Sequence, residues 1–90
     1  MLKGYVRFLQ LVKDGEEFRE DVSFDSRPKN AMYWRNVVDA DIKCQELNRG
    51  VRIPSSKGGN YLLTDFKTEQ IEPGRFSIWC EGPFILRAAN

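Results

Sequence analysis

One stretch of helical periodicity, residues 33–50 (YWRNVVDADIKCQELNRG), lies between two groups of segments in which apolar and polar residues alternate. Alternation with a period of two is typical of β-strands, whereas apolar residues three and four positions apart are typical of an amphipathic helix. Such a helix must bury its apolar face, and the strands provide the surface for it. The sequence therefore predicts an α+β fold with two layers, in which one helix packs on a mostly antiparallel sheet.

The segment before this helix predicts a hairpin. Residues 4–13 alternate with apolar side chains on much of both faces, so we expect a strand that is central or covered on both sides. Residues 13–16 (KDGE) contain an Asp-Gly pair, which suits the positive φ values of a tight turn. The return strand, residues 17–24, includes Glu20 and is expected to lie near an edge, where a charge deters unwanted pairing.

The helix is expected to begin near Pro28 and to run to about Asn48. Pro28 is tolerated in a first turn, and Asp25 or Ser26 before it offers a side-chain cap. Gly50 supplies the left-handed residue that closes a helix. Three more strands are expected after it, at residues 51–53, 61–71 and 75–81.

The last two of these strands predict a second hairpin. Its turn lies at residues 72–74 (EPG), where Gly74 is expected to need a positive φ. Residues 55–60 (SSKGGN), which are rich in glycine and serine, predict a flexible loop. They superficially resemble a phosphate-binding loop but lack its residue order. Residues 84–86 offer a last short strand. The elements follow the order ββαβββ, and the length of 90 residues predicts a single domain, residues 1–90.

The helical periodicity contains two apolar faces. The main stripe, which is expected to pack on the sheet, consists of Tyr33, Val37, Ala40, Cys44 and Leu47. Trp34, Val38 and Ile42 lie roughly 100–180° from the centre of that stripe. This second face has three interpretations. It belongs to the core, with the helix lying in a deep groove, or it contacts another chain, or it lines a ligand groove. Because Trp is enriched at the centres of interfaces, these three residues are the candidate interface.

Few residues of the chain suit catalysis or metal binding. The chain contains no histidine, which removes Ser-His and Cys-His nucleophilic pairs and the commonest metal ligand. Cys44 and Cys80 alone do not supply a four-ligand zinc site. Asp39 and Asp41 are close in sequence, but residues two apart on a helix diverge by about 200°. We therefore expect no enzyme activity, no metal and no cofactor.

A ligand pocket is the alternative to a protein interface. The candidate pocket consists of Tyr33, Trp34, Asp41 and Trp79. Aromatic faces beside a carboxylate suit a small cation or an aromatic ligand. Trp79 points to the opposite sheet face from Cys80, so its distance from Trp34 depends on the strand order.

Charge and apolar content bear on partners and location. The net charge is +1, so we expect no general attraction to nucleic acid. Apolar runs of only a few residues predict no membrane span. The first residues, MLKGY, lack the apolar region of a signal peptide, which favours a cytoplasmic protein. In that setting Cys44 and Cys80 are expected to be small buried groups rather than a disulfide.

Two stretches carry a resemblance to a known class of protein. They are ADIKCQELNRGVRIPSS, residues 40–56, and YLLTDFKTEQIEPGRFSIWCEGPFIL, residues 61–86. Together with the ββαβββ order they resemble small orphan proteins of bacterial mobile gene cassettes, the integron-cassette type. The resemblance implies a compact, often oligomeric cytoplasmic protein and transfers no functional residue.

The features above favour a small non-enzymatic interaction protein. The chain is short, lacks histidine, is close to neutral, and holds six Phe, three Tyr and two Trp. We expect a homodimer or higher homo-oligomer, and we hypothesise that it binds or inhibits another protein. A small-molecule binding protein is the alternative.

Overall fold

The computed structural model describes residues 2–54 and 57–84. Its elements are β1 (Leu2–Asp14), β2 (Glu17–Asp25), a 3-10 turn (Pro28–Asn30), α1 (Val37–Leu47), β3 (Val51–Pro54), β4 (Asn60–Leu63), β5 (Lys67–Glu72) and β6 (Arg75–Gly82). One helix lies across a mostly antiparallel sheet, which confirms the predicted α+β class. Residues 85–86 of the expected last strand, and residues 55–56 of the expected loop, lie outside the described residues.

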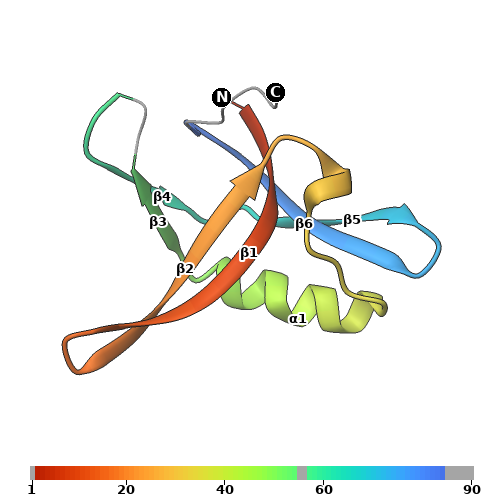
Figure 1. Cartoon of the computed structure of the whole chain (residues 1–90), viewed down its shortest axis with the longest axis horizontal. Coiled ribbons are helices and arrows are strands. Elements are labelled where there is room, and N and C mark those ends of the chain that lie inside the picture. Colours follow the sequence, from red (N-terminus) through yellow and green to blue (C-terminus); the bar gives the residue numbers. More distant parts are fainter. Residues whose placement is uncertain (1, 55–56, 85–90) are drawn as a thin grey trace.

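Four strands form the main sheet in the order β2-β1-β6-β5, and each neighbouring pair is antiparallel. β3 and β4 form a separate antiparallel pair. The helix α1 contacts β5 and β6, and Figure 1 shows it along the lower side of the sheet. Both predicted hairpins, β1–β2 and β5–β6, are confirmed. Gly74 has the positive φ, 73°, that the second turn was expected to need.

The main sheet consists of two ribbons joined by a short seam. β1 pairs with β6 only through residues 2–5, whereas its residues 5–14 pair with β2. The register of the β1–β2 pair shifts between Val6 and Phe8. Such irregularities bend and twist a strand. β1 therefore leaves β6 after the seam, and an opening remains between the two strands.

The extended segment 31–34 fills this opening. The Met32 amide donates a 3.0 Å hydrogen bond to the Val6 carbonyl of β1. On the other side, Trp34 and Phe76 of β6 exchange two backbone hydrogen bonds of 2.8 Å. The segment thus forms backbone hydrogen bonds with both β1 and β6 at the point where these two strands no longer pair with each other.

The predicted start of the helix is wrong. Pro28 begins only a short 3-10 turn, and α1 starts at residue 37. Asn36 has extended backbone angles, and its side-chain oxygen accepts a 2.7 Å hydrogen bond from the amide two residues further on. It is therefore the N-cap. Because the segment 31–34 is held extended, Tyr33 and Trp34 precede the helix and belong to neither of its faces.

The strand predicted at residues 61–71 is divided into β4 and β5. The division lies at residues 64–66, where the C-cap of α1 replaces a strand partner. The Asn48 side-chain oxygen accepts the Phe66 amide at 2.5 Å, and its nitrogen donates to the Phe66 carbonyl at 3.1 Å. The backbone amide and carbonyl of Phe66, which lie between two strands, thereby obtain hydrogen-bond partners, and the end of α1 is fixed over buried Phe66.

The core lies between α1 and the strands. Its buried members are Val6, Cys44, Leu47, Val51, Ile53, Leu63, Phe66, Ile78, Cys80 and Phe84. Ala40 is also buried, so three residues of the predicted helix stripe, Ala40, Cys44 and Leu47, are confirmed. The other two are not buried, because Val37 is 43% exposed and Tyr33 is 46% exposed.

Candidate functional site

Beyond the seam, β1 and β2 form a two-stranded arm, residues 7–23. Figure 1 shows the turn of this arm projecting beyond the other elements at the lower left. At its base, Leu9 and Val22 pack against the core, and Glu20 forms an ion pair with Lys43 of α1. A two-stranded ribbon is marginally stable on its own in water. The outer part of the arm therefore lacks the packing that usually stabilises strands.

Large apolar side chains of the arm face solvent. Leu11 is 67% exposed, Phe18 is 64% exposed and Phe8 is 55% exposed. Leu11 and Phe18 share a face with Leu9, whereas Phe8 lies on the other face, because cross-strand partners share a face and neighbours alternate. Residues 4–13 were predicted to form a strand that is central or covered on both sides. β1 is indeed an internal strand of the main sheet, but its outer part is not covered on both sides by the described residues, since Phe8 and Leu11 are exposed. Gathered exposed apolar side chains mark an interaction surface.

The two edges of the arm differ in charge. Residues 8–12 of β1 (FLQLV) contain no charged residue, no proline and no glycine, whereas residues 17–21 of β2 (EFRED) contain four charged residues. β2 is an edge strand of the main sheet, as predicted. In the part of the chain that the structure describes, no strand pairs with the arm along β1 on the side away from β2. Because charges deter pairing at a sheet edge, the β2 edge is protected and the β1 edge is open.

The outer face of α1 carries a smaller apolar patch. Val38 is 59% exposed and Ile42 is 53% exposed. The two residues lie one turn apart, roughly opposite the stripe of buried residues that includes Ala40 and Cys44. The interpretation of the second helical face as more core is therefore wrong for Val38 and Ile42. The third member of the candidate interface, Trp34, does not lie on this face, because it precedes the helix and packs partly buried against the core.

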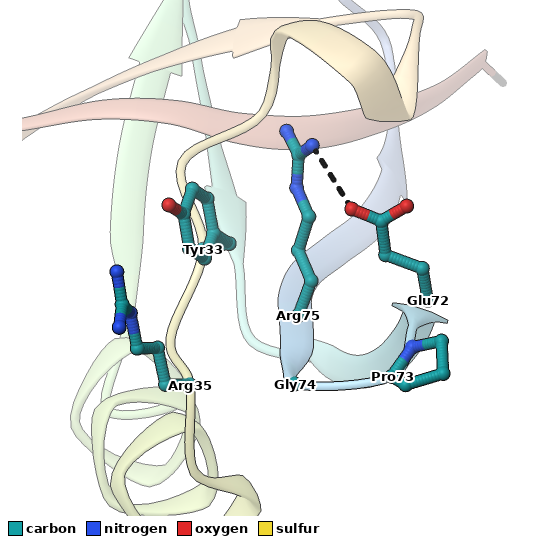
Figure 2. Close-up of a pocket in the computed structure, with 6 residues that line it drawn as sticks. All are labelled: Tyr33, Arg35, Glu72, Pro73, Gly74 and Arg75. Carbon is teal, nitrogen blue, oxygen red and sulfur yellow. Dashed lines mark ion pairs between the residues drawn. The ribbon is translucent and has the colours of Figure 1, made fainter.

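Tyr33 lines an open pocket of about 340 Å³ together with Arg35, Arg75 and the turn of the β5–β6 hairpin (Figure 2). The Arg75 guanidinium lies over the Tyr33 ring at 4.7 Å and is 3.6 Å from a carboxylate oxygen of Glu72. Two guanidinium groups beside one carboxylate make the pocket positive on balance. The Tyr33 ring therefore already contacts a cation of the chain itself.

The other members of the candidate ligand pocket lie in different surroundings. Asp41 accepts a 2.7 Å hydrogen bond from the Thr68 hydroxyl, on the α1 side of the sheet. Trp79 lies on the opposite face, because its strand neighbour Cys80 points into the core. Trp34 bridges to β6 through its backbone. The sheet consequently separates Trp79 from Asp41.

Trp79 belongs to a charged and aromatic cluster on the face of the sheet away from α1. Lys3 Nζ lies 4.1 Å from the centre of the Trp79 ring and 3.0 Å from a carboxylate oxygen of Glu69. The Tyr5 hydroxyl donates to the other oxygen of Glu69 at 2.8 Å, and Lys67 Nζ lies 5.1 Å from the Trp79 ring. The cluster links β1, β6 and β5 across the seam, so we assign it a structural role.

Glu69 gives this cluster a pH dependence. Burial would raise the pKa of Glu69, but the hydrogen bonds from Lys3 and Tyr5 and the charge of Lys3 outweigh it and hold that pKa below its ordinary value. A lowered pKa means that the ionised group stabilises the fold at neutral pH, and that this contribution is lost as the pH falls through the folded-state pKa.

Glu69→Gln is therefore expected to unfold at a lower urea concentration than the wild type at neutral pH. The difference between the two should shrink between neutral pH and an acidic pH below the folded-state pKa of Glu69, where both side chains are uncharged. Urea unfolding at the two pH values measures this effect. An equal difference at both would show that the charge of Glu69 contributes nothing.

The cysteines are free and buried, as predicted. Burial raises the pKa of the Cys80 thiol to about 12 and also raises the pKa of Cys44. Both thiols stay protonated at neutral pH and are poor nucleophiles. Among residues 2–54 and 57–84, no three His, Cys, Asp or Glu side chains gather as a metal site requires. The same ranges contain no helix with both the length and the apolar character that a membrane crossing needs.

The arm is the surface that the sequence interpretation missed. Its signal is present in the sequence, since residues 8–12 combine apolar side chains on both faces with an absence of charge. A strand of that composition is either covered by its own chain or available to another one. Only the structure shows that the described part of the chain leaves it uncovered.

A scan against protein-family models, a search of curated proteins and a search of solved structures each found no match for the chain. The resemblance to integron-cassette proteins therefore stays a prediction that rests on the sequence. The exposed apolar surfaces of the arm and of α1 are the strongest indication of function that the molecule carries.

Proposed function

We propose that this chain is a non-enzymatic interaction protein that assembles with copies of itself, and that the arm forms the contact. One observation supports the proposal above all: Phe8, Leu11 and Phe18 are each more than half exposed on an arm of only two strands. Burying an exposed Leu or Phe side chain is worth about 1.5–3 kcal/mol. Covering Phe8 and Leu11, the two of these residues that lie on β1, would provide several kcal/mol toward the cost of bringing two chains together.

The outer face of α1 is a second surface in this proposal. Val38 and Ile42 form a patch one helical turn long, which suits a contact with a different protein that the assembly binds or inhibits. The patch is smaller than the apolar surface of the arm. We therefore assign self-association to the arm and leave the helix face to such a partner.

A cytoplasmic setting without nucleic acid completes the proposal. The free state of Cys44 and Cys80 is in keeping with a reducing compartment, where thiols are not oxidised to disulfides. The net charge of +1 gives no general attraction to a polyanion. The chain contains no histidine, and burial raises the pKa of both thiols, which supports binding over chemistry.

Sedimentation equilibrium over a hundredfold range of protein concentration tests the proposal. The average mass is expected to rise with concentration from the chain mass of 10.5 kDa toward twice that value. A mass that stays at 10.5 kDa throughout would contradict self-association.

A further inference from the structure

We propose that the second copy pairs antiparallel with the open edge of β1, with Gln10 of one copy opposite Gln10 of the other. This inference rests on the proposed self-association and names the contact within the arm. The two copies would then share one continuous sheet, in the strand order β2-β1-β1-β2, around a two-fold axis perpendicular to that sheet.

The backbone of β1 favours this site over the rest of the surface. From residue 7 to the turn, β1 pairs with β2 alone, so its other edge presents amide and carbonyl groups to which the described part of the chain offers no strand. Residues 8–12 lack any charge that would oppose a second strand, whereas Glu17 and Asp21 on the β2 edge would face like charges. An added strand therefore fits the β1 edge.

The residues of this edge are complementary to themselves in one register. A centre at Gln10 gives the pairs Gln10–Gln10, Leu9–Leu11 and Phe8–Val12. A two-fold axis perpendicular to the sheet pairs residues whose side chains lie on the same face. The axis can therefore pass only through a residue position, and the two nearest alternative registers are centred one residue to either side. A centre at Leu11 would place Leu9 opposite Lys13, and a centre at Leu9 would place Leu11 opposite Arg7. Only the centre at Gln10 keeps the apolar residues together.

The same register accounts for the most exposed apolar side chain of the arm. Leu11, 67% exposed in one chain, would lie against Leu9 of the second copy. Leu9 packs at the margin of the core, so Leu11 would extend the core of the other copy. Arg7 would lie opposite Lys13 at each end of the paired stretch. These long side chains can turn toward water, and their repulsion limits the pairing to residues 8–12.

Cysteine cross-linking tests the register. Gln10 and Asp21 are directly opposite each other within the arm, and both are exposed. Gln10→Cys would bring two thiols together at the axis, at a separation that a disulfide spans. Asp21→Cys is the matched control, because three strand spacings of about 4.8 Å would keep its two thiols about 14 Å apart. The wild type reports the background, since its own thiols are buried.

Under mild oxidation, Gln10→Cys is expected to form a covalent dimer at least about tenfold faster than Asp21→Cys, because bond formation depends on the access of one thiol to the other. Equal rates for the two variants would overturn the inference, since they would indicate random collision. If the wild type sediments as a dimer while Gln10→Cys does not cross-link, the register is wrong and the proposed self-association stands. If the wild type sediments as a monomer, both fail together.

Discussion

Trp34→Ala is expected to lower the free energy of unfolding by about 2–4 kcal/mol, somewhat less than the loss typical of a fully buried Trp. Trp34 is only partly buried, but it packs against the core while its backbone joins the segment 31–34 to β6. Its loss leaves a cavity within one chain. The difference from the wild type should therefore be the same at every protein concentration, as denaturant unfolding over a hundredfold concentration range would show.

Ala40→Leu provides the comparison for this prediction. Ala40 is fully buried on the sheet-facing stripe of α1, so a larger side chain overpacks the core and costs about 1–3 kcal/mol. This loss also arises within one chain and should not depend on concentration. If the effect of Trp34→Ala instead vanished on dilution while that of Ala40→Leu persisted, Trp34 would be an interface residue and its placement against the core would be wrong.

Leu11→Glu is expected to dissociate the assembly. A two-fold contact contains each residue twice, so removing Leu11 loses two apolar burials of about 1.5–3 kcal/mol each. The dissociation constant should therefore rise by a factor of about 100 or more. The fold of each chain should persist, because Leu11 is largely exposed within one chain. Sedimentation measures the dissociation, and circular dichroism checks the fold.

Val38→Glu is the matched control for the arm variant. Val38 is exposed to a similar extent, 59% against 67% for Leu11, but it lies on the outer face of α1. A carboxylate in the first turn of a helix is also favourable to the helix dipole. This variant should keep the mass of the wild type. If Val38→Glu dissociated while Leu11→Glu stayed assembled, the self-association site would lie on α1 and not on the arm.

The alternating segments and turn residues were sufficient to predict the fold class. Asp-Gly at residues 14–15 and Pro-Gly at residues 73–74 lie at the turns of the two hairpins in the main sheet. These signals are local, since each depends on the φ values that a turn requires. Burial of Ala40, Cys44 and Leu47 also followed from local periodicity.

The start of the helix could not be predicted because a distant contact decides it. Pro28 and Asn36 are both acceptable helix starts, and the spacing of Trp34 from Val38 continues the helical pattern. β1 leaves β6 after a seam of four paired residues. The segment 31–34 is extended because it lies between the two strands there and forms backbone hydrogen bonds with both. The opening between β1 and β6 is a property of strands far apart in the sequence. Asn36 followed by Asp39 is the local signal that could have indicated the later start.

The candidate site was predicted only in part for a related reason. The sequence placed Val38 and Ile42 on a second helical face, for which burial in the core was one of three interpretations, and in the structure both are exposed. It also indicated that residues 4–13 are apolar on both faces. Such a pattern predicts that both faces of a strand are covered. It does not tell whether the covering residues belong to the same chain or to a second one. The exposure of Leu11 and Phe18 therefore could not be predicted from the sequence.

Amide hydrogen exchange along β1 tests most directly whether a second copy covers the open edge. The amides of residues 8–12 that point away from β2 have no strand partner among residues 2–54 and 57–84. In the assembly they are expected to exchange at least about tenfold more slowly at high protein concentration than after dilution, because inter-chain hydrogen bonds then protect them. The contrary result is exchange of these amides at both concentrations as fast as that of the exposed turn at residues 15–16, which would show that the edge stays open in solution.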